Sequence, residues 1–331
     1  MKTYYFSHSR TALKYGLIAL KLKKGDCVHI PDYICDVILH PLKQLGLTYK
    51  YYKMTDRLEP DWSHLEKSLT EKSKAILMIH YFGQPQDIGK FQSFCKERAL
   101  WLLEDNAHGF SGKYKDQLLG TFGDVGISAP RKTLELDDGG ILYINNEDVT
   151  LSRESLSSLQ NSNLSYGKQV VKSFLKKNFF LKKIARKMSK QPDYTNPMGF
   201  HELEISDAAI SRHSEEAIEE CDIYNIQSER MAVYKKWEKF AAKNRLTPVF
   251  ESYNLQSCPL AFPVYMDNSQ QSKEWFDRGW RYGFNVYSWP SLPIEVLEKG
   301  GESVDRWKRL VCFPIENGMY EKVDSIVKKM E

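Results

Sequence analysis

Helical and strand-like patterns of apolar residues alternate along the N-terminal part of the chain. Between Thr11 and Leu22 apolar residues recur at helical spacing, and the following Lys23-Lys24-Gly25-Asp26 carries the charges and glycine typical of a helix end. The apolar run from Cys27 to Ile30 then predicts a strand. By the same criteria we predict further helices over 35–45, 61–69 and 88–98, and strands over 49–52, 75–80, 100–103, 125–128 and 140–144.

These predicted strands are apolar throughout and are separated by helices. This pattern is typical of a mainly parallel sheet that helices cover on both faces, because such strands have no solvent-facing side. The sequence therefore predicts the α/β class. In such sheets, ligands bind in the loops at the carboxyl ends of the strands.

The chain changes in character after Asn146. The stretch from Gly167 to Lys190 holds nine basic residues and no acidic one, which predicts a basic amphipathic helix pair. Its apolar side could pack on the domain or on a second subunit, and its basic side could meet an anionic substrate or a membrane surface. A long charged helix is predicted from Glu215 to about Asn244, and short strands within 259–266, 284–287 and 311–314. We expect a large α/β domain over 1–220 and a smaller α+β domain over 221–331.

Length and composition agree with this division. At about 150 residues per domain, 331 residues correspond to about two domains. With 42% hydrophobic and 27% charged residues, the composition excludes a disordered or low-complexity chain. The net charge of +4 makes nucleic acid a weak candidate partner. No apolar run reaches the roughly 20 residues of a membrane span, and the N-terminus has no signal-like stretch, so we expect a cytoplasmic protein without stable membrane insertion.

The six cysteines are scattered through the chain, and several lie inside apolar runs. This distribution favours buried, reduced thiols over a disulfide framework. Cys27, His29, Cys35 and His40 cluster, but their spacing is poor for zinc, and we predict no metal site.

Three loops after predicted strands or before a helix carry candidate chemistry. Asp105 and His108 lie three residues apart on a turn that we place after the strand 100–103. Ser7-His8-Ser9-Arg10-Thr11 puts hydroxyl groups and an arginine at a helix N-terminus, which suits a phosphate dianion. Lys132 follows Arg131, and a cationic neighbour favours the neutral, nucleophilic amine. Together they match what pyridoxal phosphate needs: a phosphate cradle, an anion at the pyridine nitrogen and a lysine.

Motifs spread over most of the chain resemble those of the DegT/StrS sugar aminotransferases, which are fold-type I pyridoxal phosphate enzymes. The most specific are Glu104-Asp105-Asn106-Ala107-His108 and Gly120-Thr121-Phe122-Gly123-Asp124-Val125-Gly126. The others are Ser9 to Leu13, Gly25 to Pro31, His80 to Pro85, and Ser128, Lys132 and Gly139-Gly140.

The resemblance implies a role for each matched residue. Lys132 would be the Schiff-base lysine and proton shuttle, Asp105 the partner of the pyridinium nitrogen, and His108 would lie by the cofactor ring. Ser9, Arg10, Thr11 and Ser128 would hold the phosphate. The family also implies a homodimer, because its active sites are built at the subunit interface. The implied reaction transfers an amino group, that of glutamate, to a keto group of a nucleotide-linked sugar, in amino-sugar or surface-polysaccharide biosynthesis.

The chain departs from the family pattern at four places. Four steps instead of five separate Ser128 from Lys132, and Cys35 stands where many members place an aromatic ring, so that Tyr33 is the alternative stacking residue. The family's later Asn/Arg segment is reduced to Gly199-Phe200-His201-Glu202-Leu203, and a C-terminal histidine motif to 287–293. We assign Tyr81 and His201, each in a matched segment, to substrate contact.

Two alternatives stay open. One is a sugar dehydratase with the same cofactor, although dehydratases of the family carry histidine in place of the lysine. The other is a catalytically inactive member that binds a nucleotide sugar. The sequence leaves open which sugar, carbon atom and nucleotide the protein uses.

Overall fold

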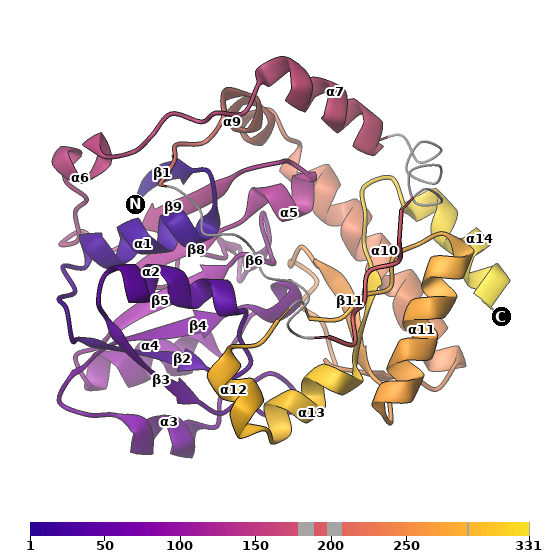
Figure 1. The fold of residues 1–331 in the computed structure, drawn as a ribbon, viewed down its shortest axis with the longest axis horizontal. Coiled ribbons are helices and arrows are strands. Elements are labelled where there is room, and N and C mark those ends of the chain that lie inside the picture. Colours follow the sequence, from indigo (N-terminus) through magenta and orange to yellow (C-terminus); the bar gives the residue numbers. More distant parts are fainter. Residues whose placement is uncertain (178–188, 197–206, 290, 331) are drawn as a thin grey trace.

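A seven-stranded sheet forms the centre of the larger part of the molecule (Figure 1). The structure is a computed structural model that describes residues 1–177, 189–196, 207–289 and 291–330. The strand order is β1-β9-β8-β5-β4-β2-β3. The strands are β1 (Lys2–Phe6), β2 (Cys27–Pro31), β3 (Thr48–Tyr52), β4 (Ser73–Ile79), β5 (Trp101–Asn106), β8 (Val125–Ser128) and β9 (Gly140–Ile144). A separate hairpin joins β6 (Lys113–Tyr114) to β7 (Gln117–Leu118).

The predicted mainly parallel sheet is confirmed. The strands β3, β2, β4, β5 and β8 pair in parallel, and β9 alone runs against the other strands of this sheet. Strand β1 pairs with β9 at the edge of the sheet and was missed by the sequence analysis. Its first residues are exposed, so it lacks the continuous apolar run that marks the buried strands.

Helices cover both faces of the sheet. Helices α1 and α2 lie on one face of the sheet and α3 and α4 on the other (Figure 1), as right-handed crossovers require for this strand order. These helices are α1 (Ser9–Ala19), α2 (Leu39–Gln44), α3 (Trp62–Ser68) and α4 (Ile88–Glu97), with the 3-10 turns Asp36–Ile38 and Tyr81–Gly83 between elements. Short helices α5 (Pro130–Leu134) and α6 (Arg153–Ser157) follow β8 and β9. The sheet is therefore buried on both sides, and its strand ends are left to form a site.

A smaller antiparallel sheet organises the C-terminal part. Its order is β10 (Thr247–Pro248), β11 (Ala261–Tyr265) and β12 (Leu310–Pro314). Among the described residues, the helices of this half of the chain are α7 (Tyr166–Lys177), α9 (Arg212–Glu219), α10 (Ile223–Lys243), α11 (Ser269–Tyr282), α12 (Ile294–Lys299), α13 (Glu302–Arg309) and α14 (Tyr320–Met330). Helix α10 packs on α14 and β11, and α11 packs on β12. These contacts form a second hydrophobic core around Trp237.

Two predictions for this region are wrong. The single helix predicted from Glu215 to Asn244 is two helices, because Asp222 caps a new one by accepting the Asn225 N–H at 3.1 Å. The stretch 284–287 is not a strand, since only Tyr287 pairs, in an isolated bridge with Cys312. Of the basic helix pair predicted over 167–190, the described part up to Lys177 contains α7, and residues 178–188 lie outside the described residues.

The segment that contains α12 and α13 returns to the large sheet. Trp289, Leu292 and Trp307 are buried in the same hydrophobic core as β2, β4 and β5. The C-terminal part therefore contributes side chains to the carboxyl edge of the central sheet. The domain boundary at 220 and 221 stays a prediction.

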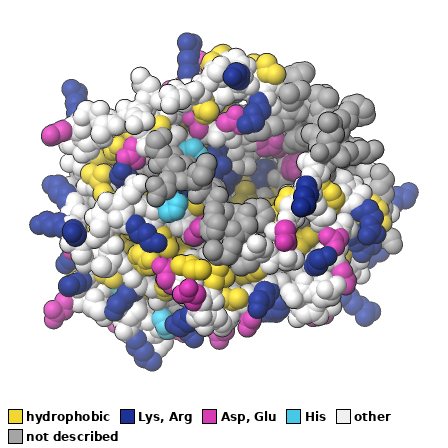
Figure 2. Space-filling model, in the orientation of Figure 1, with side chains coloured by type: hydrophobic (Ala, Val, Ile, Leu, Met, Phe, Trp, Pro, Cys, Tyr) yellow, Lys and Arg dark blue, Asp and Glu magenta, His cyan; other side chains and the backbone are white. Residues whose placement is uncertain are grey.

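The surface carries charges of both signs. On the face shown in Figure 2, basic and acidic side chains are interspersed, which agrees with the small net charge. Within the described ranges, no helix combines the length and the apolar character that crossing a membrane requires.

Candidate functional site

Strand β5 carries Asp105 to the carboxyl edge of the central sheet. The apolar run predicted that this strand ends at Leu103 and that Asp105 lies on the following turn, which is wrong: β5 continues to Asn106. Polar residues can continue a buried strand when their side chains find hydrogen bonds there. Asn106 does so by donating through Nδ2 to the carbonyl oxygens of Gly109 and Leu119, both at 3.0 Å.

A cavity of about 130 Å³ lies at this edge and gathers most of the predicted site residues. Its lining consists of His8, Ser9, Arg10, Ile34, Cys35, Val37, Ile38, Ile79, Asp105, Ala107, His108, Arg131, Lys132 and Trp289. Loops after β2, β5 and β8 meet the start of α1 here, as expected for a ligand site of a parallel sheet. Residues about 280 positions apart in the sequence, Ser9 and Trp289, thus share one cavity.

Asp105 is a buried carboxylate facing this cavity. Its Oδ1 accepts the Ala107 N–H at 2.8 Å. Burial raises the pKa of the Asp105 carboxyl, and the hydrogen bond from Ala107 and the positive charge of Lys132 only partly offset that effect. A cationic ligand group beside Asp105 would favour its charged form further.

His108 is held as a neutral imidazole. Burial, followed by the positive charge of Lys132, lowers the pKa of His108 well below its usual value. Its Nδ1 accepts the Phe82 N–H at 3.2 Å, so the ring proton lies on Nε2. Nε2 is therefore available as a donor to an oxygen atom of a ligand.

The N-terminus of α1 forms the opposite end of the cavity. Residue His8 is the N-cap and makes no side-chain cap bond. The N–H groups at a helix N-terminus are suited to binding an anion. Gly140 makes this arrangement possible: a Cβ there would lie 2.2 Å from the carbonyl carbon of His8 and 2.3 Å from the Ser9 nitrogen. Besides the predicted Ser9 and Arg10, Arg131 and His8 line this end. Neither of them was predicted from the sequence to contact a ligand, although Arg131 stands beside Lys132 in the chain.

Lys132 lies on α5, immediately after β8, and lines two cavities. One is the cavity of Asp105 and His108, and the other has a volume of about 720 Å³ and includes Lys190, Arg230 and Trp280 in its lining. Lys132 thus borders both a small cavity and a larger one that residues of the C-terminal part also line. Such a position suits a residue that acts on two bound molecules.

Four of the predicted site residues do not line the cavity. Tyr33 and Tyr81 are fully buried, and the Tyr81 hydroxyl donates to the Tyr33 carbonyl oxygen at 2.5 Å. Thr11 is buried in α1. The Ser128 hydroxyl accepts from Asn106 Nδ2 and donates to the Asn106 carbonyl oxygen, each at 3.3 Å. The ligand roles given to these four stay predictions. His201 lies outside the described residues.

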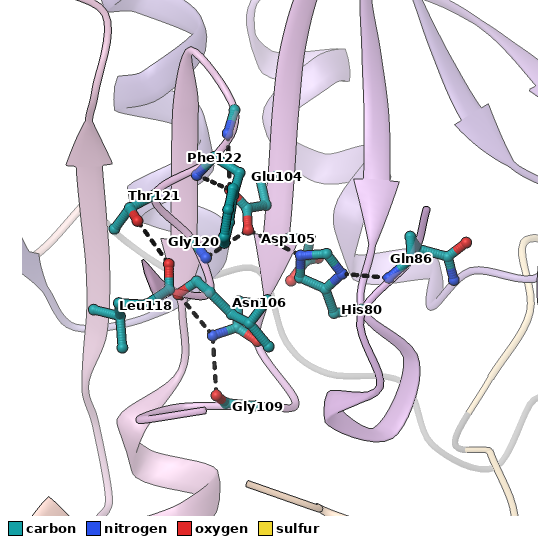
Figure 3. A network of polar contacts seen from close by, with 12 residues as sticks. His80, Gln86, Glu104, Asp105, Asn106, Gly109, Leu118, Gly120, Thr121 and Phe122 are labelled. Carbon is teal, nitrogen blue, oxygen red and sulfur yellow. Dashed lines mark hydrogen bonds and ion pairs between the residues drawn. The ribbon is translucent and has the colours of Figure 1, made fainter. Parts of the chain in front are cut away.

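A buried carboxylate network supports the strand that carries Asp105 (Figure 3). Glu104 accepts hydrogen bonds from the N–H groups of Gly120 at 2.6 Å, Phe122 at 2.6 Å and Gly123 at 2.8 Å. His80 Nδ1 accepts the Gln86 N–H at 3.1 Å, so its Nε2 donates to Glu104 at 2.9 Å. Glu104 therefore ties β5 to the glycine-rich loop before β8, a role that the sequence analysis did not assign.

We expect Glu104→Gln to lower the free energy of unfolding by about 3 kcal/mol. The amide places an NH2 group among backbone donors, and hydrogen bonds to a buried charged group contribute about 1.5 to 3 kcal/mol each. Urea unfolding measures the change. The control is Glu66→Gln, because Glu66 pairs with Arg98 on the surface and such pairs contribute about 0 to 1 kcal/mol. Equal effects of the two substitutions would contradict the role of the network.

The cysteine and histidine cluster noted in the sequence has a structural explanation. His29 is fully buried, with Nε2 2.7 Å from the Ser73 hydroxyl and Nδ1 3.0 Å from the Ser68 hydroxyl. All six cysteines are free thiols. Among the residues that the structure describes, no group of three or more metal-binding side chains comes together.

The cavity fits pyridoxal 5′-phosphate in the chemistry of its residues. Asp105 supplies a carboxylate for the pyridine nitrogen, Lys132 an amine for the aldehyde carbon, and His108 a neutral donor for the ring oxygen. The uncapped start of α1, with Arg10 and Arg131, supplies donors and positive charge for the phosphate.

Comparisons with known proteins lead to the same family. A sequence model of the DegT/DnrJ/EryC1/StrS aminotransferase family matches residues 6–189. The chain is 28% identical over 327 residues to GDP-perosamine synthase of Escherichia coli O157:H7, covering 91% of this chain and 84% of that protein.

Solved structures share the fold along the full length of this chain. PseC of Helicobacter pylori, an aminotransferase involved in the biosynthesis of pseudoaminic acid, superimposes with a TM-score of 0.68 at 15% identity, over 100% of this chain and 86% of that one. The E. coli GDP-4-keto-6-deoxy-D-mannose-3-dehydratase with bound hydrated PLP superimposes with a TM-score of 0.66 at 18% identity. The match covers 100% of this chain and 88% of that one. The family match covers more than half of the chain, and the chain therefore belongs to the DegT/DnrJ/EryC1/StrS aminotransferase family as a pyridoxal phosphate-dependent aminotransferase.

Proposed function

We propose that this protein transfers the amino group of glutamate to a keto group of a nucleotide-linked sugar, in the biosynthesis of an amino sugar of a surface polysaccharide. The observation that carries the proposal is the position of Lys132 between the cavity of Asp105 and His108 and the larger cavity beside it. The similarity to GDP-perosamine synthase over most of the chain supports a nucleotide sugar as the acceptor.

Three residues of the small cavity, Asp105, His108 and Lys132, each have one task in this reaction. When bound, pyridoxal phosphate supplies a ring that accepts the electron pair left after a proton leaves the carbon that carries the amino group. Asp105 would pair with the pyridine nitrogen, whose positive charge would favour the charged carboxylate that burial disfavours. His108, which accepts the Phe82 N–H at Nδ1, would donate from Nε2 to the ring oxygen. Lys132 would move the proton through its Nζ, since it is the lysine that lines both cavities.

The larger cavity is where we place the acceptor sugar. Its volume of about 720 Å³ is within the range of small-molecule sites. Lys190, at the end of the basic stretch 168–190, and Arg230 line it and bring positive charge that a diphosphate would need. Glu135 and Glu316 also line it and would face the sugar hydroxyls or the incoming amino group.

The assembly and location are part of the same proposal. We propose a cytoplasmic homodimer, as the family implies, in which a second copy completes the site near the start of α1. Sedimentation of the protein with its cofactor measures the mass of the assembly, and a monomer that holds the cofactor would contradict the dimer.

The test of the function has two stages. Purified protein with pyridoxal phosphate is first mixed with glutamate alone, and we expect the visible absorbance band to disappear as one equivalent of 2-oxoglutarate forms. A 4-keto-6-deoxy sugar linked to GDP, dTDP or UDP is then added, and we expect the band to return with one of them as an amino sugar forms, measured by mass spectrometry. Loss of water from the sugar instead of amination would establish the dehydratase. Absence of any spectral change with glutamate would favour the inactive, sugar-binding member.

A further inference from the structure

The cavity that contains Asp105 and Lys132 has one large aromatic side chain in its lining, and it comes from the C-terminal part of the chain. This side chain is Trp289, which is only 4% exposed. Apart from the imidazoles of His8 and His108, the other described residues of the lining carry no ring. A flat, conjugated ligand in this cavity therefore has one tryptophan against which to pack.

Neither residue considered from the sequence supplies this ring. Cys35 lines the cavity with a thiol that lies 3.4 Å from the Ser291 hydroxyl. Tyr33 is fully buried outside the lining, with its ring 5.1 Å from that of Trp289. The aromatic ring of the cavity is thus that of Trp289, which lies about 250 residues after Cys35 in the chain.

Trp289 is held on several sides. Its ring centre lies 5.6 Å from that of Tyr81, 5.8 Å from that of Phe82 and 5.2 Å from that of His108, the last in an edge-to-face arrangement at 71°. Its carbonyl oxygen accepts the indole N–H of Trp307 at 2.8 Å. This packing fixes the indole as a rigid surface, and it also restrains the imidazole of His108.

The indole N–H of Trp289 is buried and has no hydrogen-bond partner in the structure. Buried tryptophan N–H groups usually find an acceptor, because an unmet donor costs free energy. The neighbouring Trp307 follows that rule through the bond just described. Because Trp289 lines the cavity, a bound ligand can supply the acceptor that its indole N–H lacks.

We propose that Trp289 is the aromatic wall of the cofactor cavity in this chain, and that its indole N–H donates to an oxygen atom of the bound ligand. The proposal rests on the assignment of this cavity to pyridoxal phosphate. It makes Trp289 a ligand-contacting residue in place of an aromatic residue at position 35. It also links the position of the C-terminal segment to occupancy of the cavity, since Trp289 lies in the core that joins this segment to the central sheet.

The test compares Trp289→Phe and Trp289→Ala with Trp62→Phe. Trp62 lies on α3, where its ring centre is 4.8 Å from that of Phe91, and it does not line the cavity. Each protein is titrated with pyridoxal phosphate, and the tryptophan emission gives both the dissociation constant and the fraction of emission lost. The thermal midpoint without cofactor reports on folding.

We expect pyridoxal phosphate to bind about threefold to tenfold more weakly to Trp289→Phe, which keeps a ring but loses the N–H donor. We expect binding of pyridoxal phosphate to quench a smaller fraction of the tryptophan emission in Trp289→Phe than in the parent. The reason is that this variant lacks the tryptophan that contacts the ligand. Trp289→Ala, where it folds, should bind at least about 100-fold more weakly, since ring and donor are both lost. Trp62→Phe should match the parent in its dissociation constant.

A Trp289→Phe protein with the parent's dissociation constant and the parent's fractional loss of emission would overturn the proposal, even if its thermal midpoint falls, because Trp289 would then be structural only. A parent protein that shows no change with pyridoxal phosphate would overturn the cofactor assignment, and the proposal with it. The two failures are distinct, since only the second is seen in the parent.

Discussion

Replacing Lys132 with alanine is expected to abolish the visible absorbance band of the protein with pyridoxal phosphate and to lower the rate of amino transfer from glutamate by at least about 10³-fold. A positioned proton-transfer group contributes about 10² to 10⁴ to a rate, and Lys132 also supplies the amine that would hold the cofactor covalently. Lys132 is the lysine that lines the cavity together with Asp105 and His108. Absorbance spectra and the formation of 2-oxoglutarate in a single turnover measure the two effects.

The control for this substitution is Lys96→Ala, on the exposed side of α4. It should keep both the spectrum and the rate of the parent. A Lys132→Ala protein with an unchanged band would show that another lysine holds the cofactor. That outcome would also indicate that the shortened spacing between Ser128 and Lys132 reflects altered chemistry.

Asp105→Asn should lower the rate of the reaction with glutamate by about 10²- to 10³-fold, the range measured when one preorganised electrostatic group is removed from an active site. The amide is similar in shape, so the Ala107 N–H can keep an oxygen acceptor. It carries no charge, and a bound pyridine nitrogen would lose the partner that keeps it protonated. Rapid-mixing absorbance with glutamate gives the rate, and the cofactor content after gel filtration shows how much remains bound.

Asp61→Asn is the matched control for Asp105→Asn. Asp61 caps α3 by accepting the His64 N–H at 3.0 Å, and asparagine caps helices as well as aspartate does. This variant should therefore keep the activity and the cofactor content of the parent. If Asp105→Asn reacted with glutamate at the parent's rate, the charge of Asp105 would have no part in the reaction.

The sequence determined most strands of the central sheet and much of the cavity. Strands such as Val125–Ser128 and Gly140–Ile144 were predicted with the bounds they have, because a strand buried on both faces must be apolar along its whole length. Asp105, His108, Lys132, Ser9 and Arg10 were predicted as a set and line one cavity, because loops at the carboxyl ends of parallel strands lie at one edge of the sheet.

Only the tertiary structure decided which residues from distant parts of the chain complete the site. The polar pattern of Glu104-Asp105-Asn106 indicated a turn, yet these residues continue β5, since the glycine-rich loop gives Glu104 its hydrogen bonds from 16 to 19 positions away. Trp289 reaches the cavity because α12 and α13 pack back on the central sheet. Local patterns determine a strand or a helix, because its hydrogen bonds and apolar face follow from neighbouring residues. Contacts such as that of Trp289 depend on how elements far apart in the chain pack together, and no local pattern contains that information.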